Sequence, residues 1–181
     1  MLFSAGWDGP IRRWDLAERQ QLPLPQGVSG SAVVAASPVE PLLAFADDAS
    51  TIHLVSPADG KEIGTIALPD TDYTQLLFSP DGSCLAGGGN FGELVHVAVW
   101  DVKSRELMRR WDWEKGRDPH SHIECLSFSP DGQLLAGAVF RQNSAYIWVL
   151  ASGEQLAQLD HRNVYGLSFS PDGQTLATAG W

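Results

Sequence analysis

Short apolar runs alternate with polar turns along most of the chain, and many of these runs flank one recurring reversal. The pentapeptide Phe-Ser-Pro-Asp-Gly stands at Phe78–Gly82, Phe128–Gly132 and Phe169–Gly173. Every copy follows an apolar run and precedes a run that reads Leu-Ala and then a small residue. Proline presets φ at the first turn position, aspartate bonds nearby backbone amides, and glycine adopts positive φ without strain. Each copy therefore predicts a β-hairpin.

The hairpins recur at a nearly constant spacing. The turn serines are Ser37, in a degraded copy of the motif, and then Ser79, Ser129 and Ser170, so the steps are 42, 50 and 41 residues. Each step holds enough apolar runs for four strands, and no helix of two turns or more is expected. The pattern predicts one domain, 1–181, with units at about 1–27, 28–70, 71–121 and 122–160 and a partial unit at 161–181.

The third unit carries an insertion. Its Gly-rich stretch, Gly87–Gly92, delays the strand that ends in Trp100 and Asp101. No Lys-Ser or Lys-Thr pair follows and no helix opens there, so the stretch favours an extended or bulged hairpin over a phosphate-binding loop. A second Trp-Asp pair, Trp111 and Asp112, falls in the expected fourth strand of this unit and is not the repeat motif.

Units of 40–45 residues with four strands and Trp-Asp endings, as at Arg12–Asp15 and Val99–Asp101, resemble the WD-repeat β-propeller family, here with bacterial-type Ser-Pro-Asp-Gly turns. The resemblance extends along the whole chain. It implies an all-β propeller of four-stranded antiparallel blades with about four repeats. It also implies a non-catalytic scaffold that binds protein or peptide through one face. The alternatives are a module of a larger protein, a small-ligand or enzymatic propeller that uses the central channel, and a propeller of a non-WD family.

The two ends of the chain match each other. Leu2–Trp7 aligns with Leu176–Trp181, an offset of 174 residues, or four repeats. Three arrangements are therefore open: a partial or half propeller within a longer one, an eight-bladed homodimeric ring in which each chain completes the other's end blade, and four blades that close alone. An arc that stays open would leave bare sheet edges.

The first strands of three units carry an irregular pattern. Large apolar residues fall at i, i+3 and i+5, whereas a flat strand has period two. The odd step predicts a β-bulge, which re-aims the adjacent side chains towards the mouth of the channel. The re-aimed residues would be Thr74, Glu124 and Tyr165, and Trp7 would lie on the same face. These four residues form the expected partner-binding face.

The WD-repeat resemblance also implies a buried structural relay of hydrogen bonds through His, Ser or Thr, Asp and Trp. The first unit offers Ser4, Asp8 and Trp14 but no preceding His. The last unit offers His161 and Thr178 but neither Asp nor Trp, and the middle units lack at least one member. One complete relay is therefore available, and it requires the two ends to lie side by side.

Composition narrows the function classes. The chain has 12 Lys and Arg against 22 Asp and Glu, a net charge of −10. This charge argues against binding to nucleic acid or anionic membranes and fits a basic protein or peptide partner. No nucleophile elbow or carboxylate pair is recognised, and His120 and His122 beside Asp118 favour a solvated loop over a metal site. We expect no enzyme activity, cofactor or metal.

The remaining features concern location. Cys84 and Cys125 both fall in expected strands, where they are interpreted as reduced core residues. No apolar run reaches the length of a membrane helix, and no basic leader precedes an apolar stretch. These features predict a cytoplasmic protein.

Overall fold

A computed structural model describes residues 2–6, 9–23, 33–47, 50–67, 71–115, 120–140, 142 and 144–181. Every regular element in these ranges is a β-strand, which confirms the expected all-β class. The positions of Trp7, Asp8 and Asp118 lie outside the described residues.

The strands form five antiparallel sheets that follow the expected units. The first sheet holds three strands: β1 (Leu2–Gly6), β2 (Gly9–Asp15) and β3 (Gln20–Leu22). Three four-stranded sheets follow: β4 (Val34–Ala36), β5 (Leu43–Ala46), β6 (Thr51–Val55) and β7 (Glu62–Ala67); β8 (Asp72–Phe78), β9 (Cys84–Phe91), β10 (Leu94–Asp101) and β11 (Leu107–Glu114); β12 (Ile123–Phe128), β13 (Leu134–Val139), β14 (Ser144–Val149) and β15 (Gln155–Asp160). The last sheet holds β16 (Val164–Phe169) and β17 (Leu176–Gly180).

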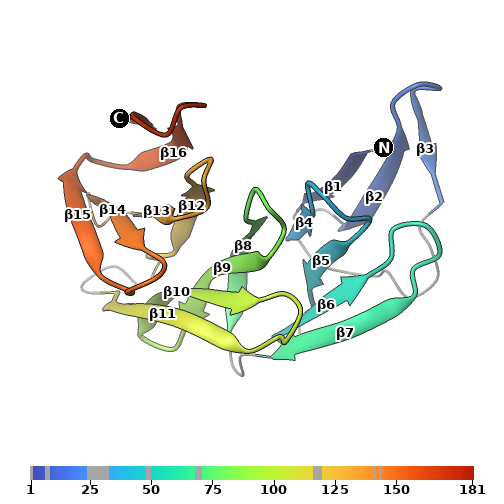
Figure 1. The fold of residues 1–181 in the computed structure, drawn as a ribbon, viewed down its shortest axis with the longest axis horizontal. Coiled ribbons are helices and arrows are strands. Elements are labelled where there is room, and N and C mark those ends of the chain that lie inside the picture. Colours follow the sequence, from blue (N-terminus) through green and yellow to red (C-terminus); the bar gives the residue numbers. More distant parts are fainter. Residues whose placement is uncertain are drawn as a thin grey trace.

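The sheets fan out in chain order along an open arc (Figure 1). The first strands β4, β8 and β12 lie on the inner side of the arc, while β7, β11 and β15 form its outer rim (Figure 1). The first and last sheets stand at the two tips, and no described strand of one pairs with a strand of the other. A single chain is thus a partial propeller, and it does not close four blades on itself.

The repeated reversals have the expected hairpin geometry. Gly82, Gly132 and Gly173 adopt φ values of +71°, +70° and +70°, which a residue with a Cβ rarely takes. In the first copy the Ser79 hydroxyl donates to the Asp81 carboxylate over 2.6 Å, and this bond lowers the pKa of Asp81. The same contact recurs in the other two copies at 2.5 and 2.6 Å.

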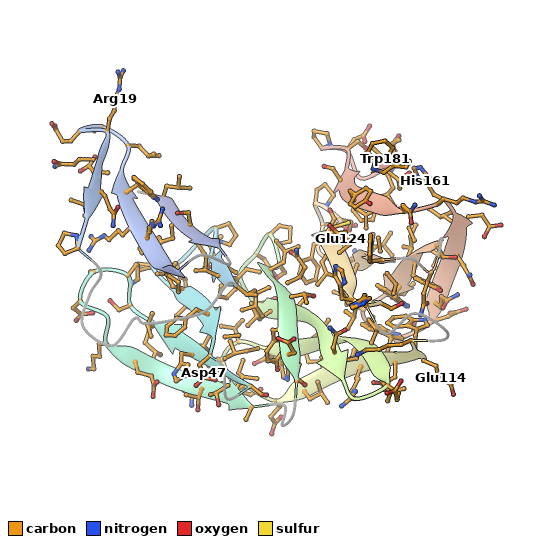
Figure 2. All side chains as sticks on the ribbon, turned by 180° about the vertical axis from the view of Figure 1, so that it is seen from behind. Arg19, Asp47, Glu114, Glu124, His161 and Trp181 are labelled. Atoms are coloured by element: carbon orange, nitrogen blue, oxygen red, sulfur yellow. The ribbon has the colours of Figure 1, made fainter. Side chains whose placement is uncertain are left out.

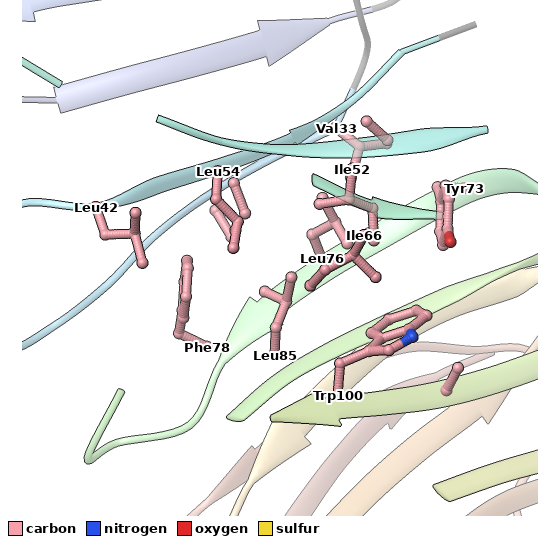
Figure 3. Close-up of a cluster of buried hydrophobic side chains, with 14 residues drawn as sticks. Val33, Leu42, Ile52, Leu54, Ile66, Tyr73, Leu76, Phe78, Leu85 and Trp100 are labelled. Atoms are coloured by element: carbon pink, nitrogen blue, oxygen red, sulfur yellow. The ribbon is translucent and has the colours of Figure 1, made fainter. Parts of the chain in front are cut away.

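Apolar side chains fill the spaces between neighbouring sheets. Figure 3 shows the largest cluster, in which Leu54 and Ile66 of the second sheet face Leu76, Leu85 and Trp100 of the third. A second cluster joins the third and fourth sheets in the same way. Because each interior sheet buries both of its faces against its neighbours, apolar burial is the main contribution that holds these sheets together.

The Gly-rich insertion forms an extended hairpin, as expected. β9 runs through it to Phe91, and the chain turns at Gly92 before β10 begins. A Cβ on Gly87 would lie 2.9 Å from the Trp100 ring, and one on Gly88 would lie 2.5 Å from Cγ2 of Ile123. These glycines therefore allow the third sheet to approach its own tryptophan and the fourth sheet closely.

One expected strand is shorter than the sequence suggested. The apolar run Gln20–Pro25 favours a third strand for the first unit, but β3 ends at Leu22. Pro23 follows it and has no amide hydrogen with which to continue the ladder. The second Trp-Asp pair, Trp111 and Asp112, lies in the fourth strand of its sheet, β11, as expected.

Candidate functional site

The first strands of three sheets contain the expected β-bulges. In β8, β12 and β16 the pairing with the next strand skips one residue, and the skipped residues are Thr74, Glu124 and Tyr165. The same apolar spacing thus produced the same irregularity three times. All three residues lie near the beginning of an inner strand, at the end of the sheet opposite to the Ser-Pro-Asp-Gly turn.

Glu124 and Tyr165 belong to a connected group of side chains on this end of the molecule. The Glu124 carboxylate lies 2.9 Å from Nε2 of His122. The His122 ring packs on Phe140 with centroids 4.9 Å apart, and Phe140 packs on Tyr165 at 5.9 Å. We name these four residues, His122, Glu124, Phe140 and Tyr165, the aromatic–acidic patch. Glu124 lies on the inner side of the arc (Figure 2), and Tyr165 is 46% exposed.

Hydrogen bonds hold His122 in one orientation. Its Nδ1 lies 2.7 Å from the carbonyl oxygen of His120, which can only accept, so Nδ1 carries the hydrogen. The contact between Nε2 and Glu124 then needs a proton of its own, on the imidazole or on the carboxyl group. The histidine therefore orients the carboxylate and forms one wall of the patch.

Thr74 has a different environment from the other bulge residues. Its hydroxyl donates to the carbonyl oxygen of Ile123 over 2.8 Å, and the neighbouring Gln75 amide donates to the carbonyl oxygen of Glu124 over 3.0 Å. These bonds fasten the third sheet to the backbone that carries Glu124. Thr74 thus lies between two sheets, next to the patch residues, rather than among them.

Sequence reasoning missed two members of the patch. Phe140 directly follows β13, at the position that Trp7 holds after β1 when Leu135 is aligned with Leu2, so the repeat alignment contained the signal. His122 was assigned to a solvated loop as half of a possible metal pair. The sequence shows no periodic signal for it, because its contact with Phe140 depends on the pairing of β12 with β13.

Two contacts between members of the expected relay are found, one in the first sheet and one in the last. Nε1 of Trp14 donates to the Ser4 hydroxyl over 2.8 Å in the first sheet. Nδ1 of His161 lies 2.7 Å from the Thr178 hydroxyl in the last sheet. His161 stands at one tip of the arc, while Arg19 of the first sheet marks the other tip (Figure 2). The complete relay stays a prediction.

The middle sheets lack the hydroxyl that the relay needs. In the fourth sheet Nε1 of Trp148 is buried with no hydrogen-bond partner among the described residues. A Cβ on Gly137, where the relay would have a serine or threonine, would lie 3.0 Å from the Trp148 ring. The ring itself thus occupies the space that a hydroxyl-bearing side chain would need.

Other groups of possible chemical interest were also located. Cys84 and Cys125 are free thiols, and burial raises the pKa of Cys125 to about 11, which makes it a poor nucleophile at neutral pH. Within the described ranges, no group of three or more His, Cys, Asp or Glu side chains could hold a metal ion. None of the described segments is a helix suited to crossing a bilayer.

A groove of about 810 Å³ lies between the second and third sheets at the end that carries the Ser-Pro-Asp-Gly turns. Leu42, Leu54 and Val102 line its apolar part, and Asp81 and Asp101 stand among its polar residues. Both aspartates bond to amides or hydroxyls of their own turns, so they serve local structure.

The comparisons with known proteins agree with this architecture. The family model described as "WD domain, G-beta repeat" matches residues 115–148 and 153–181. The first match runs through β12, β13 and β14, and the second through β15, β16 and β17. A search of curated proteins gives no match. The matches at 115–148 and 153–181 support a WD-repeat family, and the fan of four-stranded antiparallel sheets is a partial β-propeller.

Proposed function

We propose that the protein is a non-catalytic scaffold that binds a protein or peptide through the face that carries the aromatic–acidic patch. WD repeats generally mediate protein–protein interactions, which supports this class of function. The observation that carries the proposal is the half-exposed Tyr165 ring, joined through Phe140 and His122 to an oriented carboxylate at Glu124. Aromatic rings beside a charged group are typical of energetically dominant contacts in interfaces.

The chemistry of the patch favours a basic partner segment. The Glu124 carboxylate can accept from an arginine or lysine, and the exposed Tyr165 face can hold a cation above its ring. The net charge of −10 would attract a cationic peptide over a longer range. We therefore infer a ligand with at least one Arg or Lys side chain, and no role for nucleic acid or membrane surfaces.

Thr74 and Trp7, the other two residues of the expected partner-binding face, have roles that differ from those of Glu124 and Tyr165. Thr74 acts as a positioning residue, because its hydroxyl ties the third sheet to the backbone beside Glu124. Trp7 occupies the position in the first unit that Phe140 holds in the fourth, and we propose that it extends the same face. A cytoplasmic location completes the proposal, supported by the two free thiols.

The test is a binding measurement with defined peptides. Fluorescence polarisation is measured with a library of labelled dodecapeptides, and each peptide that binds is remade with its central Arg or Lys changed to Ala or Glu. We expect binding to fall at least fivefold with Ala, further with Glu, and at least fivefold in the Tyr165→Ala and Glu124→Gln variants, because each removes an interface contact worth about 1 kcal/mol or more.

The matched control is Leu156→Ala, which removes an exposed apolar side chain from an outer strand away from the patch. It should leave peptide affinity unchanged. Equal binding of the Arg and Glu peptides, or equal binding by wild type and the Tyr165→Ala variant, would overturn the proposed face. Thermal unfolding of every variant establishes that a lost signal reflects the contact and not the fold.

A further inference from the structure

The groove between the second and third sheets lies where the outer strand carries small side chains. The pairing registers align Gly64 of β7 with Arg109 of β11, and Ile66 with Trp111. Between the third and fourth sheets, Nε1 of Trp111 donates to the carbonyl oxygen of Gly153 over 2.9 Å, and the Arg109 side chain packs against the same glycine. Large side chains of β11 thus cover one interface, whereas the smaller ones of β7 border an open groove of about 810 Å³ at the other.

The floor of this groove is apolar. Leu42 and Leu54 form its buried part, and Val102 is only partly buried. Leu150, which stands where Val102 does relative to the tryptophan of the third strand, is buried in the fourth sheet. Ile63 also lines the groove, at the bulge of β7, and is 52% exposed. An apolar side chain placed here would remove surface of Val102 and Ile63 from water, which is favourable.

Charged side chains are separated along the groove. Glu40 and Asp81 come from the turns β4–β5 and β8–β9, which join first strands to second strands and lie towards the inner side of the arc (Figure 1). Lys103 and Arg105 come from the turn β10–β11, which joins the two outer strands of the third sheet. Asp101 begins that turn and is bonded to one of its amides, but the two cations outnumber it. The groove therefore has an acidic inner end and a basic outer end.

Arg105 reaches across the outer end from the third sheet to the second. Its Nη2 donates to the carbonyl oxygen of Ile63 over 3.3 Å, and its guanidinium lies over Gly64, where a Cβ would be 2.5 Å from Cζ. A guanidinium has five N–H donors, and this bond uses one of them. Arg105 is thus held in place at the end of the groove and can still bind a carboxylate.

We propose that this groove binds an extended peptide segment of a partner protein, with a large apolar side chain between a basic residue and an acidic one. The apolar side chain lies on Val102 and Ile63. The basic residue faces Glu40 at the inner end, and the acidic residue faces Arg105 at the outer end. The groove volume is within the range of about 300–1,000 Å³ found for ligand sites, so these side chains can be buried in it. This inference does not depend on the aromatic–acidic patch, which lies at the opposite end of the sheets.

The mixed charge pattern distinguishes the groove from attraction by the chain as a whole. A net charge of −10 alone would favour a peptide with basic residues on both sides of its apolar centre. In the groove, one of those residues would lie against Lys103 and Arg105, and like charges repel. A segment that carries one charge of each sign is complementary to both ends.

Fluorescence polarisation with four labelled octapeptides tests this pattern. All four have two central leucines, and their flanking residues are Arg then Glu, Glu then Arg, two Arg, or two Glu. We expect the better mixed peptide to bind at least about fivefold more tightly than either like-charged peptide, the effect of one substantial interface contact. A like-charged peptide that binds as tightly as the better mixed one, or Kd values above about 1 mM for all four, would overturn the proposal.

Reversing a charge at the outer end should change the preference. Lys103→Glu leaves an excess of negative charge there, so the peptide with two Arg should become the tightest binder. Arg19→Glu is the matched control, because it makes the same change in charge on an exposed residue at the tip of the arc (Figure 2) and should keep the mixed preference. A changed preference in both variants, or in neither, would refute the assignment of the outer end. Thermal unfolding of each variant establishes that the fold is kept.

The apolar contact is tested from the peptide side, so that the protein stays unaltered. Replacing both leucines of the best peptide with serine should weaken binding at least about tenfold, because the apolar burial is lost. An unchanged affinity would show that the floor of the groove is not used. Binding of fluorescent dodecanoate without binding of any peptide would assign the groove to a small amphiphile and overturn the proposal.

One further variant separates the groove from the proposed peptide-binding face. Tyr165→Ala should leave the affinity for the mixed peptide unchanged, because Tyr165 lies at the end of the sheets opposite to the groove. A loss of at least about fivefold in this variant would place the mixed peptide on the aromatic–acidic patch. That result would overturn the groove proposal and leave the proposal for the patch intact.

Discussion

The middle blades and the tips of the arc hold their tryptophans in opposite ways. Trp148 in the fourth sheet is fully buried, stacks on Trp111 at 4.9 Å, and has an Nε1 without a partner. Trp14 in the first sheet is only half-buried, but its Nε1 donates to Ser4. A four-stranded sheet of this fold can therefore hold its tryptophan by apolar packing alone where neighbouring sheets cover both of its faces. At the tips, directional hydrogen bonds accompany the apolar packing.

The largest expected difference is in the cost of removing each ring. Trp148→Ala should lower the free energy of unfolding by about 3–5 kcal/mol, because it empties a packed interior site. Trp14→Ala should cost about 1–2 kcal/mol, since less apolar area is lost and one bond is broken. Urea denaturation of both variants measures this. Equal costs would mean that the tips are as tightly packed as the middle, contrary to the comparison.

The middle blades also bury a histidine, His96. Burial, with a further contribution from Arg110, lowers the pKa of His96 to about 4, and neither ring nitrogen has a hydrogen-bond partner in the part of the chain that the structure describes. The unfolded chain binds this proton near pH 6.5, so stability falls as the pH drops from about 6.5 towards 4, by up to about 3 kcal/mol.

His96→Leu should remove that loss while keeping the side chain apolar and similar in volume. Unfolding curves for wild type and variant between pH 7.5 and 4.5 measure the effect. An acid dependence that is identical in both proteins would place the sensitive group elsewhere.

A smaller effect is expected from a single methyl group. Gly88→Ala would bring a Cβ within 2.5 Å of Ile123 and push the third and fourth sheets apart, at a cost of about 1–3 kcal/mol. Gly166→Ala at the tip meets only Ala179 at 3.9 Å and should be nearly neutral. Melting temperatures of the two variants compare the close packing of the middle with the open space at the tip. Similar shifts in melting temperature would show that the tip is packed as closely as the middle.

The smallest effect concerns a histidine that does have partners. Burial lowers the pKa of His53, but hydrogen bonds to Glu62 at 2.7 Å and Asp47 at 3.0 Å outweigh it and raise the pKa overall. Its contribution to stability is therefore fully present below about pH 6.5 and is lost as the pH rises through the folded-state value.

Because these groups are partly exposed, His53→Gln should cost less than about 1 kcal/mol. The cost measured by urea unfolding should be larger at pH 5.5 than at pH 8.5. A larger cost at the higher pH would reverse the assigned direction and remove the contrast with His96.

The fold was accessible from sequence because its signals are local and repeated. The Ser-Pro-Asp-Gly turns specify hairpins through φ and side-chain bonds, and the i, i+3, i+5 pattern located the bulges at Thr74, Glu124 and Tyr165. The patch was less accessible. The contacts of His122 with Phe140, and of Thr74 with the carbonyl of Ile123, join residues from different strands or sheets. They depend on sheet twist and spacing, which no short pattern encodes.

The three Ser-Pro-Asp-Gly reversals share one sequence and one backbone geometry, and they lie at the opposite end of the sheets from the aromatic–acidic patch. The hairpin turns and the proposed binding patch thus lie at different ends of the same strands. Substitutions in the patch leave the turns between the strands untouched. The protein is therefore a suitable starting point for engineering new specificities, blade by blade, on a framework that does not have to be rebuilt each time.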